Sequence, residues 1–355
     1  MIRGFVSANT KSPHNIFSGL LKFEARWYCS ISFGFKDKIS PELCDNLQRN
    51  GYAVVDEIFE KVTIQQIREE VLNMYNGSHM HKNCTHLVNN ATKRLVEKHH
   101  IHEAELTLDH NIQSMAPVCS QLNNDRSLPV MLNLFMPKLT LESQAIKLQV
   151  NSGGGGCFPC HFDSDEQVDG RKVTAIIYAN PMWQPGDGGQ LRLYPFPYSA
   201  PIDIEPVSGR MVLFSSTRML HRVLPSAATQ RVCLTVWLSQ LRSRQRGSPL
   251  FAGSPLSSTF SADSDQTKQI ASLMQPHIRN HVLKMVYAQE WAESIELSHP
   301  YTLERDGMVE QHWREVEMIR KALKSCEPTI QYLEDVCKNS HESMPNLHKL
   351  PISWF

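Results

Sequence analysis

Between residues 145 and 239 the chain is a series of short β-rich runs, and this feature most limits the folds available to it. The runs are bounded by turn residues, most clearly at 153–156 and 185–189. They are AIKLQV (145–150), KVTAIIYA (172–179), QLRLYP (190–195), PIDIEP (201–206), RMVLFSS (210–216), MLHRVL (219–224) and RVCLTVWLS (231–239). Many short strands separated by turns predict an antiparallel sandwich or barrel of the jelly-roll type.

Helical patterns flank this series. After GYAVVDEIF (51–59), which predicts a strand, Thr63 and Gln66 have the spacing of a capping box at the start of a helix. Helical periodicity returns at 277–295 and 306–326. The predicted fold is mainly β with flanking helices, in which a jelly-roll core precedes a C-terminal helical extension.

Residues 78–102 are polar and hold six of the sixteen histidines. A histidine-rich stretch can bind metal, but the spacing here is irregular and no acid is regularly interleaved. We therefore predict a solvated loop. A helix is expected to begin near Glu103 and to stop before Pro117, because proline disrupts a helix interior.

The charge balance gives no electrostatic reason to expect a nucleic acid or an anionic membrane as partner, since basic and acidic residues number 36 each. No run approaches the roughly 18 apolar residues that span a bilayer. Nine cysteines without regular spacing do not resemble a disulfide framework and favour a reducing compartment.

The N-terminal segment has a composition of its own. The first 35 residues contain four basic residues, several serines and a single acid, Glu24. This pattern is typical of a mitochondrial transit peptide, so residues 1–35 are predicted to be a targeting segment. The alternative is a disordered tail, and the protein would then be cytoplasmic or nuclear.

A candidate metal site comes from His161 and Asp163, which are separated by one residue, and from His221 downstream. Strand alternation places positions i and i+2 on the same side, and a histidine on a neighbouring strand can complete the set. Two histidines and one carboxylate form the facial triad of non-haem iron(II) oxygenases, which leaves positions open for a 2-oxo acid and dioxygen. Zinc, which prefers tetrahedral sites, is the less suitable metal.

A candidate carboxylate-binding residue, Arg231, begins the last strand of the series. A guanidinium stays charged and binds a carboxylate through two hydrogen bonds. Tyr178 and Thr235 could add hydroxyl donors, which a buried carboxylate needs.

Residues 41–240, which include these candidate site residues, resemble the prolyl 4-hydroxylase superfamily of iron(II)- and 2-oxoglutarate-dependent oxygenases. The resemblance is strongest to the Egl nine type of protein prolyl hydroxylase. The matching segments are HFD (161–163), DGRKVTAIIY (169–178), GGQLRLYP (188–195), DIEP (203–206), MVLFSS (211–216), the stretch from His221 to Arg231, and LTVW (234–237).

The resemblance implies a double-stranded β-helix fold, and the oxygenase domain is assigned to residues 36–240. Residues 241–265 are rich in Ser, Gly, Arg and Pro and are predicted to be a linker, and 266–355 are predicted to be the helical extension. It implies iron(II) bound by His161, Asp163 and His221. It also implies that Arg231 and Tyr178 hold 2-oxoglutarate, and that L-ascorbate assists the reaction.

The expected activity is that of a dioxygenase that hydroxylates a prolyl residue of a protein or peptide and releases succinate and carbon dioxide. The alternatives are an oxygenase that acts on a small molecule or another side chain, and a non-catalytic metal-binding scaffold.

One position departs from the Egl nine pattern. The residue ten before the first iron-binding histidine is a tyrosine in that type and helps to hold the co-substrate, whereas here it is Asn151. We expect weaker co-substrate binding unless Asn151 or Gln149 substitutes for the tyrosine.

A competing motif overlaps the first ligand, because Cys157 to His161 fits the C-x-x-C-H signature of c-type haem attachment. That interpretation leaves Asp163, His221 and the strand pattern unexplained. Cys157 and Cys160 could instead be a redox pair or simple packing residues.

Overall fold

The computed structural model describes residues 33–89, 92–106, 110–165, 169–241, 266–339 and 352–355. The predicted targeting segment, 1–35, and the predicted linker, 241–265, lie almost wholly outside these described residues. Within the described ranges, no helix is long and apolar enough to cross a membrane.

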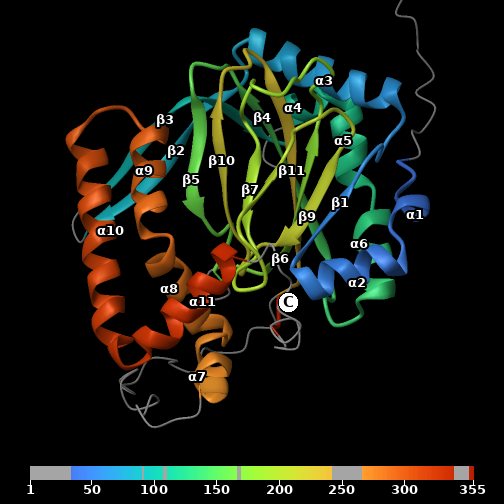
Figure 1. Cartoon of the computed structure of the whole chain (residues 1–355). Coiled ribbons are helices and arrows are strands. Elements are labelled where there is room, and N and C mark those ends of the chain that lie inside the picture. The colour runs from blue at the N-terminus through green and yellow to red at the C-terminus, as the bar shows by residue number, and fades with distance from the viewer. Residues whose placement is uncertain (1–32, 90–91, 107–109, 166–168, 242–265, 340–351) are drawn as a thin grey trace, which may run out of the picture. The chain divides into compact units, whose positions relative to one another are not determined.

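Two antiparallel sheets form the core, as the series of short runs predicted (Figure 1). The major sheet has the order β1-β9-β6-β11-β4-β3-β2 and the minor sheet the order β5-β10-β7-β8. The strands are β1 (Tyr52–Val55), β2 (His81–Asn89), β3 (Thr92–Glu105), β4 (Ser143–Asn151), β5 (Gly156–His161), β6 (Arg171–Tyr178), β7 (Leu191–Tyr194), β8 (Ile202–Ile204), β9 (Met211–Ser215), β10 (Leu220–Ser226) and β11 (Arg231–Ser239). Each predicted run between 145 and 239 corresponds to one of these strands, and the jelly-roll fold class is confirmed.

Helices complete the fold. They are α1 (Phe35–Lys38), α2 (Pro41–Asn50), α3 (Lys61–Asn76), α4 (His110–Met115), α5 (Pro117–Asn124), α6 (Ser127–Phe135), α7 (Gln266–Leu273), α8 (Pro276–Val286), α9 (Ala288–Ser298), α10 (Leu303–Ala322) and α11 (Glu327–Asn339). Helices α3 and α5 contact β4 of the major sheet. Ile146, Leu148 and Val150, which alternate along β4, are buried. The residues between them therefore face the space between the two sheets.

The start of α3 differs from the prediction. The helix begins at Lys61, and Glu60 occupies the N-cap without a side-chain hydrogen bond, so the capping box at Thr63 is wrong. Thr63 is instead buried in the first turn, on the same side as Ile64 and Ile67. The helix ends before Gly77, whose N–H bonds to the carbonyl of Asn73.

The loop predicted over 78–102 is also wrong, because β2 and β3 pair as an antiparallel hairpin. Strand β3 then pairs with β4 over Ile101 to Glu105, so the helix expected from Glu103 does not form, and α4 begins at His110. Val96, Ile101 and Ala104 are buried, whereas neighbouring polar residues face solvent. A hairpin with one solvent-exposed face needs few apolar residues, so the sequence shows no clear strand pattern here.

The C-terminal helices pack against the outer face of the minor sheet. Tyr194 and Leu220, which are paired across β7 and β10, share a buried apolar cluster with Leu273, Val282 and Leu283 of α7 and α8. Helix α9 lies along β5 (Figure 1). All described residues belong to one compact unit, Ser32–Phe355, so the helical extension and the two sheets are built together.

Candidate metal and co-substrate site

The three predicted ligands converge at one end of the minor sheet. His161 ends β5 and lies opposite His221 of β10 in the antiparallel register. Asp163 follows two residues later, with Oδ1 3.5 Å from Nε2 of His161 and 3.6 Å from Nε2 of His221. One ligand atom from each residue lies within 4.8 Å of the others, so the group is close enough to share a metal ion.

Backbone contacts set the tautomer of both imidazoles. Nδ1 of His161 lies 2.7 Å from the carbonyl oxygen of Pro159, and Nδ1 of His221 lies 3.1 Å from that of Met219. A carbonyl oxygen only accepts hydrogen bonds, so each Nδ1 carries the proton. In the neutral ring each Nε2 then presents a lone pair toward Asp163, the arrangement that a metal-binding histidine requires.

The carboxylate of Asp163 is held by two donors that the sequence did not reveal. Oδ2 accepts hydrogen bonds from Oγ1 of Thr174 at 2.6 Å and from Nε1 of Trp237 at 3.3 Å. The hydroxyl of Thr174 also lies 2.8 Å from Oγ of Ser216. These contacts engage Oδ2 and leave Oδ1 directed at the two histidines.

Charge favours a divalent cation here. Burial alone would raise the pKa of Asp163, but His221 and His161 outweigh it and hold the pKa well below its usual range. Burial lowers the pKa of His161, and the neighbouring His221 adds to this effect. The carboxylate is therefore ionised and His161 neutral at physiological pH, the states in which both bind metal.

Arg231 begins β11 and is buried, with 2% of its surface exposed. Its Nε donates to the carbonyl of Gly189 at 2.8 Å, and its guanidinium lies 5.2 Å from the ring centre of Tyr178. The Tyr178 hydroxyl is buried and has no hydrogen-bond partner among the described residues. Burial raises its pKa, so the hydroxyl stays protonated and can donate. A buried donor without a partner beside a buried cation is suited to bind the carboxylate of a ligand.

One face of β11 connects the arginine to the ligand group. Arg231, Cys233, Thr235 and Trp237 alternate along the strand and so share a face. Trp237 contacts Asp163 at one end, and Arg231 lies at the other. Thr235 thus lies between the predicted metal and carboxylate sites, where a small dicarboxylate would bridge them.

Comparison with known proteins agrees with this geometry. Residues 146–239, from β4 to the end of β11, match the model of the 2OG-Fe(II) oxygenase superfamily. A prolyl 4-hydroxylase structure from Phytophthora capsici is 29% identical with a TM-score of 0.67, and the match covers 89% of this chain and 99% of that one. This region resembles a 2OG-Fe(II) oxygenase domain, and the chain as a whole resembles the P. capsici prolyl 4-hydroxylase.

Curated relatives of the oxygenase domain include prolyl hydroxylases. The chain is 32% identical over 136 residues to "Hypoxia-inducible factor prolyl hydroxylase" of Caenorhabditis elegans, which covers 36% of this chain and 18% of that protein. It is 37% identical over 101 residues to "Prolyl hydroxylase EGLN3" of Homo sapiens, covering 28% of this chain and 41% of that protein. The chain thus spans less than half the length of these relatives. The P. capsici match leaves out only about a tenth of this chain, so it extends into the C-terminal helices.

Asn151 has a local role in the oxygenase domain. It is 1% exposed, and its side-chain amide donates to the carbonyl of Gly156 at 2.7 Å. Its Oδ1 accepts from the N–H of Gly153 at 3.0 Å. Both ends of the side chain therefore hold the turn between β4 and β5. Gln149, on the same face, accepts a hydrogen bond from the thiol of Cys233 at 3.3 Å.

Cys157 and Cys160 are three residues apart on β5, and the register shift between Phe158 and His161 interrupts the regular alternation of the strand there. Both thiols are free and buried. Burial raises the pKa of Cys157 to about 11 and also raises that of Cys160. Buried thiols with raised pKa values stay protonated and unreactive, which favours the packing interpretation.

Proposed function

We propose that this protein is an iron(II)- and 2-oxoglutarate-dependent dioxygenase that hydroxylates a prolyl residue of a protein or peptide. The proposal rests on the face of β11 that the metal-ligand group and Arg231 share. A three-residue ligand group, with Nε2 of both histidines directed at Asp163, lies at one end, and buried Arg231 with the Tyr178 hydroxyl, which has no partner among the described residues, lies at the other. Iron(II), when bound, would couple the decarboxylation of 2-oxoglutarate by dioxygen to hydroxylation of the substrate.

Each residue has a defined task in this proposal. His161, Asp163 and His221 would hold the iron from one side. Arg231 would pair with the far carboxylate of 2-oxoglutarate, and Tyr178 would donate a hydrogen bond to it. Since all of these groups are fixed by the backbone or by packing before any ligand binds, the site is preorganised.

The prolyl substrate is supported by the relatives of the oxygenase domain, which are named as prolyl hydroxylases. A protein or peptide is the substrate class that fits these names. Ascorbate, which the resemblance implies as an assistant, would keep the metal in its reduced state.

The test is mass spectrometry of a library of proline-containing peptides incubated with the protein, iron(II), ascorbate and 2-oxoglutarate. The proposal predicts the gain of one oxygen atom at prolyl residues, dependent on 2-oxoglutarate and absent with Asp163→Ala. Consumption of 2-oxoglutarate without peptide modification would indicate a small-molecule substrate. Metal binding without any consumption would favour the scaffold.

A further inference from the structure

Two of the three candidate metal ligands, His161 and His221, lie on the minor sheet, where strand pairing alone fixes them poorly. β5 is the edge strand of that sheet, so it has a hydrogen-bonded neighbour on one side only. Its pairing with β10 is irregular, with register shifts on both sides of Val223. An edge strand with an irregular ladder has fewer backbone hydrogen bonds to fix it, so contacts from outside the sheet matter more for its position.

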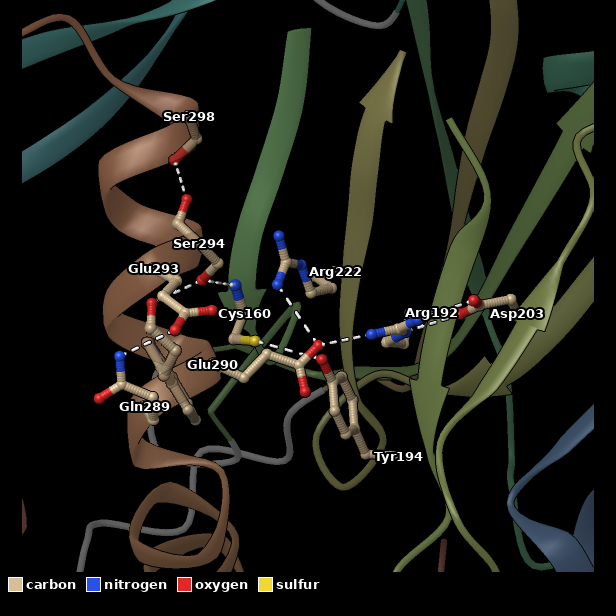
Figure 2. A network of polar contacts seen from close by, with 11 residues as sticks. Cys160, Arg192, Tyr194, Asp203, Arg222, Gln289, Glu290, Glu293, Ser294 and Ser298 are labelled. Carbon is tan, nitrogen blue, oxygen red and sulfur yellow. Dashed lines mark hydrogen bonds and ion pairs between the residues drawn. The ribbon is translucent and has the colours of Figure 1, made fainter. Parts of the chain in front are cut away.

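Helix α9 contacts the residue next to the first ligand. Oγ of Ser294 accepts a hydrogen bond from the backbone N–H of Cys160 at 3.0 Å, and Ser294 is fully buried (Figure 2). The hydroxyl of Ser294 donates in turn to the carbonyl of Trp291, which fixes its direction. Helix α9 thus supplies a hydrogen-bond acceptor for the backbone N–H immediately before His161, on the edge of β5 that has no neighbouring strand.

The same helix contacts the residue next to the second histidine. Oε1 of Glu290 accepts hydrogen bonds from Arg222 of β10 at 3.3 Å and from Arg192 of β7 at 2.9 Å. Arg192 also forms two hydrogen bonds with Asp203 of β8, at 2.7 and 2.8 Å. Figure 2 shows this carboxylate between the helix and the strands. One acidic residue therefore links α9 to β10 and β7, and through Arg192 to β8.

Burial makes the Glu290 contact costly to lose. Arg222 is 4% exposed, and its Nε has no hydrogen-bond partner among the described residues. In the described part of the chain, Glu290 is the carboxylate that forms an ion pair with Arg222. A buried cation deprived of its counter-charge is strongly unfavourable, so β10 would shift to expose Arg222.

Alternation explains how these contacts reach the metal ligands. His161 and His221 point between the sheets, so the flanking Cys160 and Arg222 face outward, toward α9. We infer that Glu290 and Ser294 of α9 are positioning residues that hold His161 and His221 at metal-binding separation from outside the barrel. This inference rests on the proposed function, and it gives the C-terminal helices a role in the chemistry.

The test uses the full-length protein and Co(II), a redox-stable stand-in for iron(II) with absorption bands that report its coordination. Glu290→Gln keeps the shape of the side chain but removes the charge, and Ser294→Ala removes the acceptor. Each variant is expected to bind Co(II) at least about tenfold more weakly, which is the typical effect of losing a residue that orients a metal ligand. The absorption bands of the bound Co(II) should also change.

Two controls separate positioning from general stability. Glu293→Gln changes an exposed acid on the same helix, and Asp56→Asn breaks an ion pair with Arg210 at the other sheet. Both controls are expected to bind Co(II) as the wild type does, even where Asp56→Asn lowers the Tm.

The inference would be overturned if Glu290→Gln and Ser294→Ala bound Co(II) with wild-type affinity and spectrum. Wild-type protein that binds Co(II) but forms no succinate with iron(II) would overturn the proposed activity, and the variant affinities would still decide the positioning role. Wild-type protein that binds no Co(II) would overturn both.

Discussion

Thr174 donates its hydroxyl hydrogen to Oδ2 of Asp163 over 2.6 Å, which leaves Oδ1 as the carboxylate oxygen that faces His161 and His221. The two residues come from different segments, a strand interior and the loop after β5. The metal-facing oxygen of Asp163 is thus selected by a neighbouring strand.

We predict that Thr174→Val, which preserves shape but removes this donor, weakens Co(II) binding by roughly tenfold. The freed carboxylate can rotate, because only the longer bond from Trp237 remains. Isothermal titration measures the change, and Thr174→Ser, which retains the hydroxyl, serves as the matched control. Equal affinity for the valine and serine variants would contradict the prediction.

The second prediction concerns Gly189, which packs directly against Arg231. A Cβ at this position would lie 2.7 Å from Cδ of Arg231, and the backbone φ is +73°. Gly189→Ala should displace the guanidinium and raise the KM for 2-oxoglutarate on the order of tenfold or more.

The control for Gly189 is Gly186→Ala in the same loop. Gly186 also has a positive φ, +103°, but a Cβ there meets nothing within 4 Å. Backbone strain is therefore common to both variants, and only Gly189→Ala disturbs Arg231. A similar rise in KM for both would show that strain in the loop, and not the contact with Arg231, controls co-substrate binding.

The third prediction is that Asn151 stabilises the fold and does not bind the co-substrate. Asn151→Ala leaves the carbonyl of Gly156 and the N–H of Gly153 without their partners, at a cost of about 1–3 kcal/mol in the free energy of unfolding. We expect a lower Tm with unchanged affinity for 2-oxoglutarate, measured by titration into the Co(II)-loaded protein. An unchanged Tm with lost affinity would instead place Asn151 at the co-substrate.

The fourth prediction is a pH dependence of stability caused by His299. This residue is buried between α9 and the hairpin, with Nε2 2.8 Å from Oγ1 of Thr85. Burial lowers its pKa from 6.5 to about 4. As the pH falls below 6.5 the unfolded chain takes up a proton first, so stability is lost down to about pH 4, by on the order of 3 kcal/mol at most.

Urea unfolding of the wild type and of His299→Gln at pH 7, 5 and 4 tests this dependence. Glutamine does not titrate, so the difference between the two proteins isolates the contribution of His299 from those of other buried histidines. The variant should lose less stability than the wild type on acidification. If the free energy of unfolding fell equally with pH in both proteins, His299 would not be the cause of the pH dependence.

The strands between 145 and 239, except β5, were predictable because β-branched runs and turn residues are local signals. Strand β5 was missed, since GCFPCH has little β propensity and contains Pro159. Proline is tolerated there because it lies between Phe158 and His161, where the pairing of β5 with β10 shifts register. The hairpin over β2 and β3 was missed because its exposed face is polar.

The candidate site was predictable only where its residues share a motif. His161 and Asp163 lie two apart, and His221 and Arg231 follow on successive strands. Thr174 and Glu290 have no such signal, because their contacts join residues that are distant in sequence. Glu290 and Arg192, for example, are 98 positions apart, so only the fold brings them together.

Succinate formation from 2-oxoglutarate by the purified protein, with iron(II) and ascorbate, tests the central claim most directly. The account predicts turnover by the wild type that is abolished in His161→Ala, which removes a metal ligand, and in Arg231→Ala, which removes the carboxylate partner. Wild-type protein that binds iron(II) but neither binds nor consumes 2-oxoglutarate would contradict it.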